Sequence, residues 1–301
     1  MSATVHQIGR DSAPSLEPII SLVASDMNQV NSVILDRMQS EIPLIPELAG
    51  HLIAGGGKRM RPMLTLAAAK LIGYPGDRHF KLAAAVEFIH TATLLHDDVV
   101  DGSDLRRGKT AANLIFGNPA TVLVGDFLFS RSFELMVEDG SLKVLKILSN
   151  ASAVIAEGEV NQLTAQRKID TSEDRYGRNL GIAFQLVDDA IDYSSDRETM
   201  GKDAGDDFRE GKVTLPVILA YSRGNEEERK FWKDAIIGHK SSDDDLARAT
   251  GLIRSTGAMT DTMSRARHYG QRAIDALGIF ASGKAKDAMT EAVEFAISRA
   301  Y

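Results

Sequence analysis

Two acidic clusters of the same pattern stand out in this 301-residue chain. Residues 97–101 read Asp-Asp-Val-Val-Asp, and residues 188–192 read Asp-Asp-Ala-Ile-Asp. In a helix, the first and last Asp of each cluster lie about 40° apart on one face, one turn from each other. Converging carboxylates are hard oxygen ligands of the kind that bind Mg²⁺ or Mn²⁺. The six carboxylates belong to Asp97, Asp98, Asp101, Asp188, Asp189 and Asp192.

Both clusters lie in segments that are apolar nearly all round, residues 77–101 and 178–195, and this predicts two buried helices. Buried carboxylates repel one another and lose hydration, so a cation must compensate them. Exposed or lysine-paired carboxylates are the alternative for a single cluster, but two identical clusters argue against it. Because Mg²⁺ completes its shell with water and substrate phosphates, the pattern predicts a phosphorylated substrate held through bridging metal ions.

Basic residues near the clusters are candidates for direct phosphate binding. Residues 55–62 read Gly-Gly-Gly-Lys-Arg-Met-Arg-Pro, where glycines let backbone amides approach an anion and Lys58 and Arg61 supply charge. Further cations follow the two acidic clusters: Arg106 and Arg107 after the first, Lys202 and Lys212 after the second.

His90 lies two helical turns before Asp97 on the same face, although a hydrogen-bonded core histidine is an equal alternative. Together these residues predict a site made of the two aspartate clusters, with basic residues around them. That arrangement suits one diphosphate chelated by metal ions and a second held directly by Lys and Arg.

The spacing of apolar residues predicts helices over most of the chain. The expected helices cover residues 16–39, 77–101, 117–138, 142–166, 178–195, 214–222, 260–277 and 284–300. No internal repeat, low-complexity tract or linker divides the chain, and only 8 prolines interrupt it. We therefore expect one all-α domain over residues 1–301, with residues 1–14 as a flexible tail.

Composition excludes several classes of function. The formal net charge is −7, which disfavours general binding of nucleic acid or anionic lipid. The absence of Cys excludes disulfides, thiolate metal sites and a cysteine nucleophile, and it fits a cytoplasmic protein without proving it. No stretch approaches ~18 consecutive apolar residues, so no membrane span is expected.

The motifs resemble those of the trans-isoprenyl (polyprenyl) diphosphate synthases, most of all the long-chain octaprenyl and decaprenyl diphosphate synthases. This resemblance implies an isoprenoid-synthase-type helical bundle around a central cavity, a homodimer, and Mg²⁺-dependent transfer of a prenyl group. The motifs that carry it are residues 56–62, 94–101, 106–108, 158–162, 184–192, 201–203 and 211–216.

The resemblance also implies roles for single residues. Three Mg²⁺ ions, replaceable by Mn²⁺, would be held by Asp97, Asp101 and Asp188, supported by Asp98, Asp189 and Asp192. The allylic diphosphate would contact Arg106, Lys202, Lys212 and Gln185, and isopentenyl diphosphate would contact Lys58, Arg61, His90 and Arg107. Ionisation of the allylic diphosphate gives a cation that the double bond of isopentenyl diphosphate attacks, and the proton then lost passes to the released diphosphate.

One departure from the family pattern lies at residues 169–177. The family carries a Lys-Thr pair on a helix between its Gly-Glu-x-x-Gln helix and its second aspartate helix, and a helix of about 11 residues has no room here. Either this protein lacks that helix, or a segment is missing near 176–177 and the numbering continues across it; we favour the second. A true deletion would remove a phosphate-binding lysine and one wall of the cavity.

Residues before the first cluster bear on the length of the product. Thr93 and Ala92 are small, whereas short-chain relatives tend to place an aromatic ring there, and Ile89 and Phe88 occupy the next turn. Residues 85–97 span about 18 Å of helix, which accommodates several isoprene units beyond a C15 chain. Residues 87–96 also resemble the octaprenyl and decaprenyl synthases that make quinone side chains, and this resemblance favours a product of about C40–C50. The alternative is that Ala92 is a packing position and the product is geranylgeranyl diphosphate or shorter.

Two rival functions stay open on sequence alone. A class I terpene cyclase shares the ionisation step but needs only one diphosphate, so the second aspartate cluster and the basic motif of residues 56–62 argue against it. A non-catalytic subunit of a heteromeric synthase often loses aspartates, and all six are present here.

Overall fold

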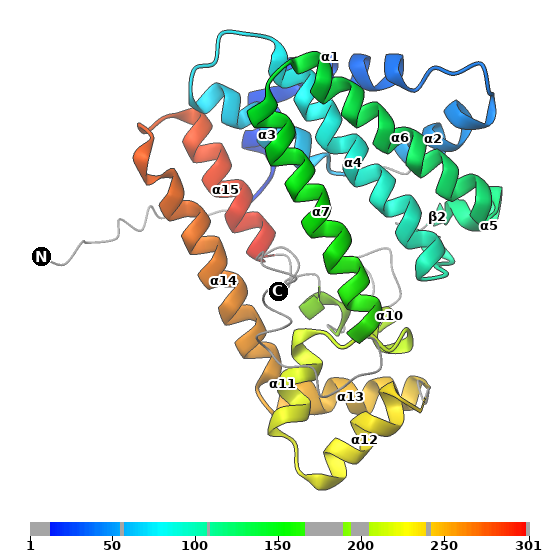
Figure 1. Cartoon of the computed structure of the whole chain (residues 1–301). Helices are drawn as coiled ribbons and strands as arrows, with labels where there is room; N and C mark the ends of the chain where they lie inside the picture. The colour runs from blue at the N-terminus through cyan, green and yellow to red at the C-terminus, as the bar shows by residue number, and fades with distance from the viewer. Residues whose placement is uncertain are drawn as a thin grey trace, which may run out of the picture.

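The computed structural model describes residues 13–54, 57–106, 109–165, 189–193, 205–238 and 242–298. These residues form helices and one two-stranded hairpin, which confirms the expected all-α class (Figure 1). The strands are β1 (Leu105–Arg106) and β2 (Lys109–Thr110). The helices are α1 (Glu17–Arg37), α2 (Leu44–Ala54), α3 (Met60–Leu71), α4 (Arg78–Val100), α5 (Ala112–Phe116), α6 (Asn118–Asp139), α7 (Leu142–Ala165), α10 (Asp206–Arg209), α11 (Leu215–Arg223), α12 (Glu226–Ile236), α13 (Asp243–Ser255), α14 (Ala258–Ala276), the short 3₁₀ helix η1 (Leu277–Ile279) and α15 (Lys284–Ser298).

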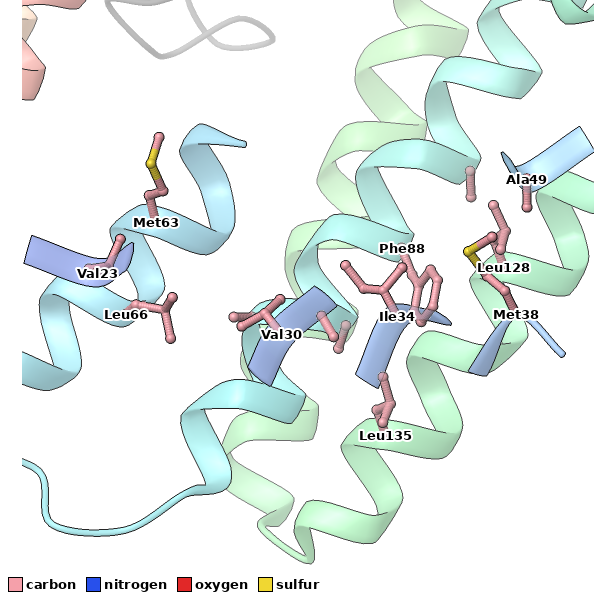
Figure 2. Packing of buried hydrophobic residues seen from close by; sticks show 14 of the residues in the cluster. Val23, Val30, Ile34, Met38, Ala49, Met63, Leu66, Phe88, Leu128 and Leu135 are labelled. Carbon is pink, nitrogen blue, oxygen red and sulfur yellow. The ribbon is translucent and has the colours of Figure 1, made fainter. Parts of the chain in front are cut away.

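Helix α4 is the centre of the larger hydrophobic cluster. It packs against α1, α3 and α6, and its alanines at positions 83, 84 and 85 are buried, as expected for a helix that is apolar nearly all round. Figure 2 shows Phe88 of α4 next to Ile34 of α1, with Leu128 and Leu135 of α6 in the same cluster. This packing fixes the position of the aspartates at the end of α4.

A smaller hydrophobic cluster lies around α11, α12, α13 and α14. Phe208 of α10 meets Trp232 of α12 edge to face, with 6.4 Å between ring centres, and this contact anchors the short acidic helix α10. Helices α12 and α13 each begin with a capping box, Asn225 with Glu228 and Ser242 with Asp245. Helix α14 begins in this lower part of the molecule and runs to the upper part, where α15 follows it (Figure 1).

The turn after α4 returns the chain toward the helix it has just left. Gly102 has a φ of 63°, a left-handed conformation that glycine adopts without steric cost. Strands β1 and β2 then pair antiparallel, with Leu105 opposite Thr110 and Arg106 opposite Lys109. The sequence did not predict this hairpin, and it is the element that brings Arg106 beside the first aspartate cluster.

Most expected helices agree with the structure to within three residues at either end. The segment 178–195 lies largely outside the described residues, of which 189–192 are helical. Asp77 stands at the N-cap of α4, but its side chain makes no capping hydrogen bond. None of the helices in the described ranges is long and apolar enough to cross a membrane.

Candidate active site

An ion pair links the first aspartate cluster to the hairpin. Asp98 is fully buried at the end of α4, and its Oδ1 lies 2.5 Å from both Nε and Nη2 of Arg106. Within the described ranges, Oδ2 of Asp98 has no hydrogen-bond partner. A charge-assisted bond this short and buried fixes the guanidinium firmly, so Asp98 orients Arg106.

Lys212 connects the first aspartate cluster to the acidic segment that follows the second cluster. Its Nζ lies 2.9 Å from Oδ2 of Asp101, 2.7 Å from Oε2 of Glu210 and 3.9 Å from Oδ1 of Asp207. Burial alone would lower the pKa of this lysine, but Asp207, Asp101 and Glu210 outweigh burial and raise it. Lys212 is therefore a permanent cation between the two acidic segments.

The second cluster is tied to the helix that follows it. Both carboxylate oxygens of Asp192 accept backbone hydrogen bonds, from the amide of Asp206 at 3.1 Å and from that of Asp207 at 3.2 Å. The carbonyl oxygen of Asp192 also accepts from the amide of Gly205 at 2.9 Å. Asp189 is buried one turn earlier on the same helical segment. These bonds place the acidic residues of α10 directly against the second cluster.

The site carries more negative charge than its cations offset. Burial, and then the charge of Glu159, raises the pKa of Asp97 to about 7. Burial, and then the charges of Asp207 and Asp206, raises the pKa of Asp192 to about 8, although the two amide bonds act in the opposite direction. The pKa of Asp189 is likewise raised, mainly by burial. Such shifts mark a cluster whose charged form needs a further cation.

These residues fit a divalent cation by their chemistry. The donors are carboxylates with neither His nor Cys among them, which is the preference of Mg²⁺, and their raised pKa values show uncompensated charge. Among the described residues, no three acidic or histidine side chains by themselves form a metal-binding group. The remaining candidate ligand, Asp188, lies outside the described residues.

The basic motif begins helix α3. Nζ of Lys58 lies 4.6 Å from the centre of the Phe295 ring of α15, a cation–π contact. Arg61 is in the first turn of α3 and His90 is half-buried on the neighbouring helix α4. Helix α3, which Lys58 precedes and which carries Arg61, packs against α4, which carries His90.

The proposed chain-length residues divide between two surroundings. Phe88, Ile89 and Ala92 are buried, and Phe88 and Ala92 belong to the cluster that α4 forms with α1 and α6. Thr93 is half-buried, and its hydroxyl donates to the carbonyl oxygen of His90 at 2.8 Å. Thr93 lies about 40° around the helix from Asp97, whereas Ala92 lies about 140° away, so Thr93 shares the face of the aspartate.

Several expected site residues, Arg107, Gln185, Asp188 and Lys202, lie outside the described residues. Three acidic residues that the sequence reasoning did not assign affect the site, namely Glu159, Asp207 and Glu210, which interact with Asp97, Asp101 or Lys212. Sequence position could have indicated Asp207 and Glu210, because both lie within five residues of Lys212 in the segment after the second cluster.

The fold is a helical bundle in which carboxylates of the first aspartate cluster and of the segment after the second surround Lys212, and this arrangement suits a metal-dependent enzyme that acts on diphosphates. A polyprenyl synthetase family model matches residues 42–178 and 170–253, and members of this family use divalent metal ions. The chain belongs to the polyprenyl synthetase family and is a polyprenyl diphosphate synthase, a prenyltransferase of isoprenoid biosynthesis.

Known proteins resemble the chain over nearly its whole length. It is 40% identical to octaprenyl diphosphate synthase of Escherichia coli K12 over 321 aligned positions, covering 95% of this chain and 99% of that enzyme. A polyprenyl synthase from Caulobacter crescentus CB15, solved with calcium and isoprenyl diphosphate, is 48% identical with a TM-score of 0.91, covering 97% of this chain and 100% of that one. A decaprenyl diphosphate synthase from Rhodobacter capsulatus is 44% identical with a TM-score of 0.90, covering 95% and 100%.

Proposed function

We propose that this enzyme condenses isopentenyl diphosphate with an allylic diphosphate to make a long all-trans polyprenyl diphosphate of about C40–C50, for a quinone side chain. The observation that carries the proposal is the bridge from Lys212 to Asp101, which sets the two acidic segments around a single cation. The named products of the octaprenyl and decaprenyl relatives support the long chain.

The carboxylates of Asp97, Asp98, Asp101, Asp188, Asp189 and Asp192 are the proposed environment for Mg²⁺, with Asp97, Asp101 and Asp188 as principal ligands. When bound, three divalent ions would neutralise the allylic diphosphate and make it a better leaving group. Lys212 and Arg106, which Asp101 and Asp98 hold in place, would bind the same diphosphate with Lys202 and Gln185.

Isopentenyl diphosphate would be held by Lys58, Arg61, His90 and Arg107. The C–O bond of the allylic diphosphate breaks with its electron pair leaving on oxygen. The double bond of isopentenyl diphosphate then forms the new C–C bond, and the proton released from carbon passes to the departing diphosphate. No side-chain base is needed, so the protein contributes position and charge.

We further propose that the growing chain follows the face of α4 that carries Thr93 and His90. Ala92, Ile89 and Phe88 support that face from the buried side, since all three are packed away from solvent. The small side chain of Thr93 would leave room for the tail beside Asp97. A geranylgeranyl or shorter product remains the alternative for chain length.

A homodimer is the proposed assembly. Large apolar side chains are exposed along α6 and α7, two helices that contact each other, and the most exposed are Leu142 at 81% and Leu123 at 67%. Exposed apolar surface of this extent is typical of an interface. Residues 1–301 are proposed to form one domain, because Lys212 and α14 tie its two hydrophobic clusters together.

A non-catalytic subunit is kept as a second candidate because of two observations. The family model matches in two stretches that meet at residues 170–178, and the alignment with the Escherichia coli enzyme spans 321 positions, more than the chain has residues. Both observations support the proposal that a segment present in relatives is missing near 176–177. In the family, that segment carries the Lys-Thr pair.

Incubation with Mg²⁺, labelled isopentenyl diphosphate and a geranyl or farnesyl primer tests these alternatives, with products sized by mass spectrometry. Products of about C40–C50 would support the proposal, and shorter ones would correct the chain length. A terpene cyclase would incorporate no label. The pure chain could also fail to condense the substrates, while a version carrying the relatives' segment condenses them. That result would favour the non-catalytic subunit.

A further inference from the structure

The residue at the start of α3 has an uncommon backbone conformation. Arg59 stands at the N-cap with φ 50° and ψ 35°, and it is the only non-glycine residue with positive φ in the described part of the chain. A residue with a Cβ rarely adopts this left-handed conformation, so contacts around it must hold it there. It lies between Lys58 and Arg61, two proposed ligands of isopentenyl diphosphate.

An ion pair with the neighbouring helix holds the side chain of Arg59. Its Nη1 lies 3.0 Å from Oε1 of Glu87 on α4, and the two side chains are only 19% and 12% exposed. Solvent and salt screen such a pair much less than a surface pair. Loss of one partner leaves the other as a poorly solvated charge, so the contact is sensitive to substitution. The pair thus ties the first residues of α3 to the middle of α4.

Glu87 lies close along α4 to His90, the third proposed ligand of isopentenyl diphosphate. It precedes His90 by one helical turn and lies about 60° from it around the helix axis. The diphosphate of isopentenyl diphosphate would be gripped from both helices, by Lys58 and Arg61 at the start of α3 and by His90 on α4. Binding by several groups falls steeply when their spacing is wrong, so a tie at this level matters.

We propose that Arg59 and Glu87 form a positioning pair for the isopentenyl diphosphate site. The pair keeps the left-handed turn at Arg59 and holds the start of α3 at a fixed distance from His90, without either residue touching the substrate. This inference rests on the proposed function, since it takes the site to be that of isopentenyl diphosphate.

Calorimetric titration with isopentenyl diphosphate alone, in the presence of Mg²⁺, tests the pair directly because no condensation occurs without a primer. Glu87→Gln keeps the size of the side chain and removes its charge. Arg59→Gly removes the side chain and permits the same backbone conformation. We expect each variant to weaken the Kd for isopentenyl diphosphate about tenfold, a change of about 1.4 kcal/mol. The double variant should be no weaker than the worse single variant within about twofold, because both changes break one contact.

Steady-state kinetics supply the second measurement. The KM for isopentenyl diphosphate should rise in both variants, while the KM for the allylic primer stays within about twofold. Asp139→Asn is the matched control, since it breaks a 2.6 Å ion pair between Asp139 at the end of α6 and Arg78 at the start of α4. It should lower the melting temperature without changing the Kd for isopentenyl diphosphate.

An unchanged Kd for isopentenyl diphosphate in Glu87→Gln would overturn the inference. If Arg59→Gly nevertheless bound isopentenyl diphosphate more weakly, Arg59 would be a direct ligand. Multiplicative losses in the double variant, equal shifts of both KM values, or the same loss in Asp139→Asn would also overturn it. A wild-type chain that neither binds isopentenyl diphosphate nor condenses it would instead refute the proposed function itself.

Discussion

Nζ of Lys212 lies 2.9 Å from Oδ2 of Asp101, although 111 residues separate them in the chain. The contact joins the end of α4 to the segment that follows the second aspartate cluster, and it places one cation among three carboxylates. The active site is therefore assembled from two halves of the sequence, and its electrostatic balance depends on this lysine.

Lys212→Met should destabilise the metal-free protein as well as inactivate it. The substitution leaves Asp101, Asp207 and Glu210 without the ammonium group that they surround, a loss of about 3–5 kcal/mol for a buried ion pair. The melting temperature should fall without metal, and Mg²⁺ should restore part of the loss. An unchanged melting temperature without metal would show that the bridge is not formed in solution.

Asp98→Asn should act through Arg106. The substitution removes the charge that holds the guanidinium at 2.5 Å, so we expect kcat to fall roughly 10²-fold, as for loss of one preorganised charge contact. The Mg²⁺ concentration for half-maximal activity should change little in Asp98→Asn and rise strongly in Asp101→Asn. Arg106→Gln combined with Asp98→Asn should be no worse than Arg106→Gln alone.

If Asp98 were instead a direct metal ligand, its variant would need as much additional Mg²⁺ as Asp101→Asn. The two variants are a matched pair, because each exchanges one carboxylate for an amide of the same size in the same cluster.

The metal-free protein should be more stable at pH 5.5 than at pH 8. Asp97 and Asp192 have folded-state pKa values of about 7 and about 8, above the usual 3.8, so the folded chain retains protons that the unfolded chain has released. Stability therefore falls as pH rises from about 4 to about 8. Glu138 and Asp139 act in the opposite direction, because Arg37 and Arg78 lower their pKa values and their contribution to stability is lost as pH falls. That loss is confined to pH below about 4.5.

Thermal denaturation with and without Mg²⁺ measures this dependence. We expect the melting temperature without metal to drop by roughly 5 °C or more between the two pH values, and Mg²⁺ to stabilise more at pH 8. Asp97→Asn should flatten the profile. A metal-free protein that is more stable at pH 8 would contradict the raised pKa values.

Thr93→Phe should shorten the product, whereas Ala92→Phe should mainly lower the stability of the protein. Thr93 shares a face of α4 with Asp97, so a ring there should stop elongation at about C15–C20 while the first condensation stays within about tenfold, or about 1.4 kcal/mol. Ala92 is packed with Phe88 in the core, so a ring at this position should cost about 1–3 kcal/mol of stability through overpacking.

Product analysis by mass spectrometry, with a melting curve for each variant, separates the two positions. If Ala92→Phe shortened the product as much as Thr93→Phe, the tail would pass the Ala92 side of α4 and not the Thr93 face. If Thr93→Phe abolished the first condensation, position 93 would belong to the reacting centre.

The sequence by itself determined the helices and the chemistry of the site. Apolar residues at helical spacing predict α1, α4, α6, α7, α14 and α15, because periodicity is a local property of each segment. The repeated acidic pattern at residues 97–101 and 188–192 predicts hard oxygen ligands without any structure.

Only the tertiary structure decided which charges meet. Lys212 with Asp101, Arg106 with Asp98, and Arg59 with Glu87 join residues from different elements, and the hairpin or packing that brings each pair together has no signature in the sequence. The structure likewise separated Thr93 from Ala92, because neighbours in sequence point to different sides of a helix and only packing shows which side is filled.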